Sequence, residues 1–167
     1  MRSPAAQWLR PGRQRPIPLF LGLRMTIWSV ALPGMKRLVP LKRLASLMWM
    51  EGGHRSDPAA RSRIVALSAR LTRIRVRGSR GNCLERSLLA YRYLAAIGAD
   101  PRLVIGVTRT DAGVAGHAWV TLDGQPIHDD PAGLEGVTPL AEFGRGGVIT
   151  DPGTAREVGR VRVRVWS

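Results

Sequence analysis

The spacing of apolar residues changes at Gly98, and this change is the strongest constraint on the fold. Apolar residues before Gly98 recur at helical spacing, whereas the residues after Asp100-Pro101 form short apolar runs bounded by turn residues. Helices that precede strands along a chain are typical of an α+β fold. We therefore predict α+β, with a helical N-terminal portion followed by an antiparallel sheet.

Three helices are expected before Gly98, over residues 37–50, 57–72 and 83–97. The second has a well-defined start, because Asp57 is a good N-cap and Pro58 suits the first helical position. Its arginines lie away from its apolar stripe. They form either a solvated face or a docking surface for an acidic partner. Gly98 is expected to end the third helix in the left-handed conformation that favours glycine.

Three strands are expected after Gly98, over residues 102–108, 116–122 and 125–130. Asp123-Gly124 marks a hairpin turn between the second and the third. Pro126 indicates that the returning strand lies at a sheet edge or contains a bulge. The alternating residues 160–166 predict either a half-buried strand or a loose basic tail.

The chain length of 167 residues suits one domain, with or without a helical appendage. The start of the chain is rich in Pro and Arg and shows no period, which predicts disorder. We expect four segments: a disordered stretch over 1–24, a helical region over 25–80, a core over 81–131 and a C-terminal extension over 132–167.

Positive charge is concentrated in the first half of the chain. The formal net charge is +14, yet residues 19–82 carry 13 basic and 2 acidic residues, while residues 83–131 carry 4 basic and 6 acidic. A protein that binds nucleic acid over its whole surface does not need this asymmetry, whereas a basic arm beside a neutral site would produce it. We expect no specific nucleic-acid partner.

Composition excludes several other classes of protein. The single cysteine rules out an internal disulfide, and the absence of CxxC, HExxH and P-loop motifs argues against a metal or nucleotide cofactor. No apolar run approaches the about 18–20 residues of a membrane span, and no signal peptide is evident. We therefore expect a cytoplasmic protein with no cofactor and no metal.

Cys83 is the first candidate for chemistry, because it stands at the start of a predicted helix. Helix N-terminal N–H groups and the helix dipole favour a thiolate there. A lone cysteine is more often a small buried apolar residue. His117 begins a predicted strand and Asp129 and Asp130 follow the hairpin turn, so an imidazole and a carboxylate can meet the thiol, as thiol-nucleophile catalysis requires.

The length of the hairpin loop decides which carboxylate lies opposite His117. A two-residue loop at Asp123-Gly124 places Asp130 opposite His117, and a three-residue loop with a bulge places Asp129 there. Both loops are compatible with the residues present, so spacing leaves the two carboxylates as alternatives.

These motifs together resemble those of one known family. They are Cys83-Leu84-Glu85-Arg86-Ser87-Leu88, Leu103-Val104-Ile105-Gly106-Val107, His117-Ala118-Trp119-Val120 with Asp123-Gly124, and Asp129-Asp130-Pro131. The chain is similar, over about residues 38–131, to the lasso-peptide leader peptidases, which are transglutaminase-like cysteine proteases related to the microcin-processing B protein.

The resemblance implies a papain-like, transglutaminase-type core with the cysteine helix packed on an antiparallel sheet. It implies that Cys83 is the nucleophile, that its backbone N–H is an oxyanion donor, and that His117 is the general base and acid. The acid of the family stands twelve positions after the histidine, which favours Asp129 as the orienting carboxylate. The family usually has alanine where this chain has Ser87.

The resemblance also implies partners. The substrate is a ribosomally made precursor peptide, and the leader is held by a small winged-helix, PqqD-like recognition protein. Residues 1–80 show helices without alternating strands, so this chain resembles the split form whose recognition domain is a separate protein. A separate ATP-dependent macrolactam cyclase closes the ring of the product.

Two other functions remain open from the residues alone. The same triad could transfer an acyl group to an amine, as transglutaminases and arylamine acetyltransferases do. A basic nucleic-acid-binding protein with a structural cysteine is the other alternative, although no recognised nucleic-acid motif is present. His54, His128 and Trp119 are assigned to surface or packing roles.

Overall fold

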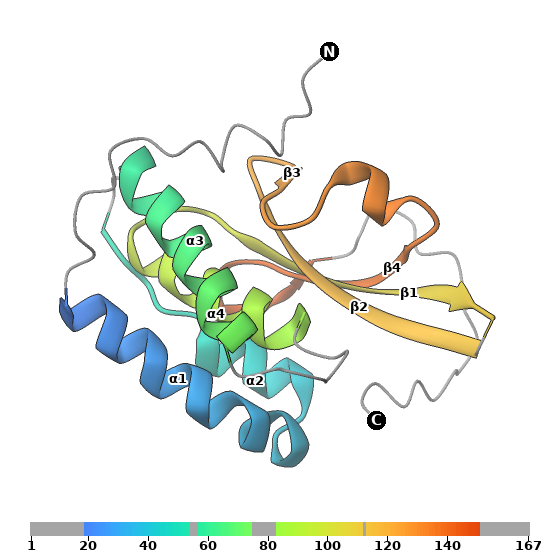
Figure 1. The fold of residues 1–167 in the computed structure, drawn as a ribbon, viewed down its shortest axis with the longest axis horizontal. Coiled ribbons are helices and arrows are strands. Elements are labelled where there is room, and N and C mark those ends of the chain that lie inside the picture. The colour runs from blue at the N-terminus through green and yellow to red at the C-terminus, as the bar shows by residue number, and fades with distance from the viewer. Residues whose placement is uncertain (1–18, 54–56, 75–82, 112, 151–167) are drawn as a thin grey trace.

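The computed structural model describes residues 19–53, 57–74, 83–111 and 113–150. These residues form four α-helices, followed by an antiparallel sheet. The helices are α1 (Leu19–Leu38), α2 (Leu41–Met48), α3 (Pro58–Ile74) and α4 (Cys83–Ala96). The strands are β1 (Arg102–Thr110), β2 (Gly113–Leu122), β3 (Gln125–Pro126), β4 (Thr138–Phe143) and β5 (Ile149–Thr150). The α+β prediction is confirmed (Figure 1).

The sheet has the strand order β3-β2-β1-β4-β5, and every neighbouring pair is antiparallel. The long β1–β2 hairpin extends away from the helices, which gather at the other side of the molecule in Figure 1. The helices in the described ranges include none that is long and apolar enough to cross a membrane.

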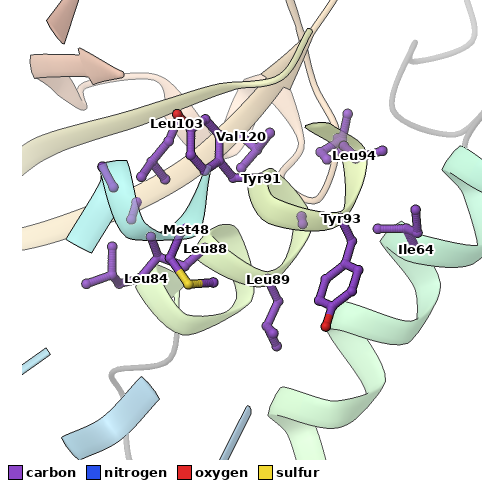
Figure 2. Close-up of a cluster of buried hydrophobic side chains, with 14 of the residues drawn as sticks. Met48, Ile64, Leu84, Leu88, Leu89, Tyr91, Tyr93, Leu94, Leu103 and Val120 are labelled. Atoms are coloured by element: carbon purple, nitrogen blue, oxygen red, sulfur yellow. The ribbon is translucent and has the colours of Figure 1, made fainter. Parts of the chain in front are cut away.

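Helix α4 lies at the centre of the hydrophobic core. Ten of its fourteen residues are buried, and it contacts the other three helices as well as β1 and β2. Figure 2 shows Leu84, Leu88 and Tyr91 of α4 among side chains from the neighbouring helices and strands. The Tyr91 hydroxyl donates a 2.5 Å hydrogen bond to the Gly144 carbonyl, and Ser87 Oγ donates one of 3.0 Å to the Ala118 carbonyl. Both bonds fix α4 to segments that follow it in the sequence.

Helix α3 begins where the sequence predicts. The carboxylate of Asp57 accepts a 3.0 Å hydrogen bond from the backbone N–H of Ala59, which satisfies one of the unpaired donors at the helix start. Ile64 and Leu67 are buried as expected. Ser68 and Thr72 are buried beside them, and their hydroxyls bond to backbone carbonyls one turn earlier.

The expectation of disorder over 1–24 is wrong for residues 19–24, which form the first turns of α1. Met25 and Leu32 of α1 are fully buried in the core that α4 occupies, and Lys36 forms a 3.0 Å ion pair with Glu85 of α4. The sequence hides this helix because Arg24 and Pro33 interrupt its apolar pattern. Residues 1–18 lie outside the described residues, as does the segment 160–166.

The helix expected over 37–50 is divided between α1 and α2. Helix α1 ends at Leu38, and α2 begins at Leu41 after Pro40. Proline disfavours helical geometry at the residue before it and lacks an N–H of its own, so Val39-Pro40 separates the two helices.

The returning strand expected over 125–130 is much shorter in the structure. Asp123 and Gly124 have positive φ angles of 52° and 75°, which make a two-residue hairpin turn. Pairing with β2 covers Gln125 and Pro126, and the N–H of Ile127 donates one further bond of 3.1 Å to the Val120 carbonyl. Beyond Ile127 the chain leaves the sheet. Pro126 lies on an edge strand, as predicted.

The C-terminal extension contributes to the sheet. Strand β4 pairs with β1, so that β1 becomes an inner strand. The register of this pair shifts between Ile105 and Gly106. A Cβ atom at Gly106 would lie 2.8 Å from the Thr138 carbonyl oxygen and 3.0 Å from the Trp119 ring. Close approach of β4 and of the indole therefore requires glycine at this position.

We expect Gly106→Ala to lower the free energy of unfolding by about 2 kcal/mol, the usual cost of overpacking a dense site. Urea denaturation would measure the change. Gly34→Ala is the matched control, because a Cβ there meets nothing within 4 Å and alanine favours the helix. Wild-type stability in Gly106→Ala would contradict the close approach.

Candidate active site

Cys83 is the first residue of α4, as the sequence predicts, and its side chain is partly buried. The first N–H groups of a helix have no acceptor inside the helix, and the Cys83 N–H is one of these groups. Those N–H groups also favour negative charge on the sulfur. The position therefore suits a nucleophilic thiolate.

His117 of β2 lies between the thiol and a carboxylate. Its Nε2 is 3.2 Å from Oδ1 of Asp129 and its ring also hydrogen-bonds to Cys83. Because Nε2 faces Asp129, Nδ1 is the nitrogen that remains for the thiol. The ring lies nearly parallel to that of Trp119, with the centroids 5.9 Å apart. Trp119 is buried, as its assignment to packing predicts, and it forms one wall beside the imidazole.

Of the two candidate carboxylates, Asp129 is the partner of His117. Asp130 instead accepts a 3.1 Å hydrogen bond from the Ala132 N–H and caps a short 3₁₀ turn, Pro131–Leu134. The hairpin has the two-residue loop, and a ladder continued from that loop would have placed Asp130 opposite His117. The ladder ends at Ile127, so the strand register does not extend to the carboxylates.

Arg86 is the residue at the site that the sequence analysis did not assign. Its Nη2 lies 2.9 Å from both carboxylate oxygens of Asp129. Arg86 follows Cys83 by three positions, which puts both side chains on one face of α4. That spacing is the sequence signal that could have identified it.

Hydrogen bonds within the site shift the pKa of each group. Burial raises the pKa of the Cys83 thiol, but bonds from His117 and from the backbone at Ala118 outweigh burial, so the pKa falls below its ordinary value. Hydrogen bonds to Asp129 and to Cys83 raise the pKa of His117 to about 9. Burial raises the pKa of Asp129, yet His117 and the charge of Arg86 lower it further. The directions of these pKa shifts favour a thiolate beside an imidazolium and a carboxylate.

An open cavity of about 290 Å³ gives access to these groups. Its lining comes from α3, α4, β2 and the segment after β3: Ala69, Thr72, Arg73, Cys83, Arg86, Gly116, His117 and Asp129. The thiol, the imidazole and the carboxylate thus share one hollow. A bound acyl group can reach Cys83 from this side.

His128 does not contact the thiol or His117 in any hydrogen bond that the described residues form. The partly buried ring of His128 contacts Ser68 Oγ at 2.9 Å and the Val65 carbonyl at 3.1 Å, and burial lowers its pKa to about 4. It packs on α3, as predicted. His54 lies outside the described residues. Within the described ranges, no group of three or more His, Cys, Asp or Glu side chains could hold a metal ion.

A thiol at a helix start, an imidazole on a strand and a partly buried carboxylate are the groups that thiol-nucleophile catalysis uses. A family model for the transglutaminase-like superfamily matches residues 28–142, which is well over half of the chain. The chain therefore belongs to the transglutaminase-like superfamily, whose members are generally cysteine-dependent enzymes. No curated protein and no solved structure matches the chain.

The shifted pKa of Cys83 predicts how fast iodoacetamide alkylates it. We expect the pH at which wild-type alkylation reaches half its plateau to lie below 9.0, because hydrogen bonds from His117 and the backbone hold the pKa of the Cys83 thiol below that ordinary value. In His117→Ala the pKa rises again, and alkylation at pH 7 should be ~10–100-fold slower. Mass spectrometry reports the rate at this one cysteine without ambiguity. Equal rates in the two proteins would contradict the thiolate–imidazolium pair.

Proposed function

We propose that this protein is a cysteine peptidase that removes the leader from a ribosomally made lasso-peptide precursor. The single observation that carries the proposal is the contact chain from Cys83 through His117 to Asp129 at an open cavity. Membership of the transglutaminase-like superfamily supports cysteine-dependent chemistry. The resemblance of the cysteine-helix and hairpin motifs to those of leader peptidases supports this substrate.

In the first half-reaction, the Cys83 thiolate attacks the carbonyl carbon of the peptide bond between leader and core. The oxyanion forms beside the N–H of Cys83. When the carbon–nitrogen bond breaks, the His117 imidazolium gives its proton to the leaving nitrogen. The core peptide departs with a free amino terminus, and the leader remains as a thioester on Cys83.

In the second half-reaction, water attacks the thioester. His117, now neutral, takes a proton from the water, and the carbon–sulfur bond breaks to release the leader with a carboxyl terminus. The returning thiolate and the imidazolium restore the starting pair. Asp129 orients the imidazole and stabilises its positive charge throughout. Activity should decline above about pH 9, where His117 loses the proton that the leaving nitrogen needs.

The proposal includes partners. A separate winged-helix recognition protein would hold the leader and present the junction to the cavity, and a separate ATP-dependent cyclase would close the macrolactam. The described elements that precede α4 are helices, and the segment 19–53 carries basic residues with Glu51 as its only acid. This composition suits contact with an acidic partner or an acidic leader segment.

Incubation with a candidate lasso-peptide precursor, followed by mass spectrometry, tests the proposal. We expect wild-type protein with the recognition protein to release leader and core, and Cys83→Ala to release neither. Asp129→Asn should slow cleavage by roughly 10²–10⁴-fold, since the imidazole loses its orienting charge. Asp130→Asn is the matched control, because asparagine also caps a turn, and it should cleave at nearly the wild-type rate.

Two results would contradict the proposal. Cleavage by Cys83→Ala would exclude the thiol as the nucleophile. The second is the formation of an amide between the new end of the leader and a primary amine added to the reaction, without any leader that carries a free carboxylate labelled by heavy-oxygen water. That product would identify acyl transfer to an amine instead of hydrolysis.

A further inference from the structure

We propose that Arg86 is a positioning residue that holds Asp129 in the orientation and charge state that His117 requires. The inference rests on the same triad as the proposed function. It does not depend on which substrate the triad cleaves.

The backbone does not hold Asp129 in place. The ladder between β2 and β3 ends with the bond from the Ile127 N–H, and the next backbone bond is that from the Gly133 N–H to the Asp130 carbonyl. Residues 127–129 form a bend. The position of the carboxylate therefore depends on side-chain contacts.

Side chains fix this bend to two helices. His128 binds Ser68 and Val65 of α3, and Asp129 binds Arg86 of α4. The first contact holds the backbone beside Asp129, whereas the second holds the carboxylate itself. Arg86 is the only one of these anchors that touches the atoms that His117 uses.

Arg86 also links the Asp129 carboxylate to α4, the helix that carries Cys83. Cys83 and Arg86 lie one turn apart on α4, the most buried helix of the described fold. A rigid helix that bears the thiol at its start and the guanidinium three residues later fixes the distance between Cys83 and Asp129. His117 must fit between them, which limits its rotation.

The Arg86 side chain has a destabilising feature that an apolar side chain at this position would not have. The Nε atom of Arg86 is buried and has no hydrogen-bond partner within the part of the chain that the structure describes. A buried donor without an acceptor lowers stability, and an apolar side chain would avoid this cost. An arginine here is better explained by its effect on Asp129.

The charges around Asp129 determine whether loss of Arg86 favours or disfavours the thiolate of Cys83. Asp129 is faced by His117 from β2, by Arg86 and Cys83 from α4, and by Arg73 from α3, which also lines the cavity, while the partly buried His128 precedes it in the chain. Loss of Arg86 removes a positive charge from the cavity that Cys83 lines and allows Asp129 and His117 to move. Both consequences destabilise the thiolate relative to the neutral thiol, so Cys83 should lose its proton at higher pH.

Alkylation of Cys83 by iodoacetamide across a pH series tests this inference. In Arg86→Gln, we expect the pH at which alkylation reaches half its plateau to rise by about one unit, so that the rate below this midpoint falls about tenfold. Arg86→Lys keeps the charge and should recover most of the shift. Melting curves identify any variant that does not fold.

Arg92→Gln is the matched control on the same helix. Arg92 donates a 3.0 Å bond to the Leu47 carbonyl and stacks on Trp28, away from the cavity, so its loss should lower stability without moving the alkylation midpoint. An unmoved midpoint in Arg86→Gln would overturn the inference, as would a lysine variant that behaves like the glutamine variant. The readout needs no peptide substrate, so failure to cleave the precursor would leave it unaffected.

Discussion

Burial of helix α4 is the constraint on which the rest of the structure depends. The helix is surrounded by α1, α2, α3 and the sheet, and apolar side chains on nearly all of its sides are removed from water. Its N-terminus is the exception, because it emerges at the cavity and carries Cys83. The same packing that stabilises the fold thus places the thiol at a fixed point beside β2. Helix α4 therefore both stabilises the fold and positions the thiol.

The three reactive groups reach the site in different ways. Cys83 is placed by a helix and His117 by a strand, so regular hydrogen bonding fixes both. Asp129 follows the end of the hairpin, where the ladder has stopped, and the side chain of Arg86 holds it. The site therefore combines two rigid elements with one segment that is fixed by charge and by side-chain hydrogen bonds.

Much of this arrangement could be predicted from the sequence, since local patterns encode it. Helical spacing, the cap at Asp57 and the Asp123-Gly124 turn predict α3, α4 and the hairpin, and the start of α4 indicates Cys83. The choice of Asp129 over Asp130 could not come from spacing, because β3 ends early. Contacts of the following side chains with α3 and α4, instead of the strand register, determine which carboxylate lies beside His117. Helix α1 and strand β4 were missed, since both acquire their apolar contacts only through packing on distant segments.

The central claim is that Cys83 and His117 form a charged pair supported by Asp129. The most direct measurement is the titration of the His117 ring by nitrogen-edited NMR, with assignment from variants of the three histidines of the chain. We expect a pKa of about 9 for His117, which falls toward its ordinary value of 6.5 in Cys83→Ala and in Asp129→Asn. A wild-type His117 that titrates near 6.5 and does not respond to either substitution would contradict the account.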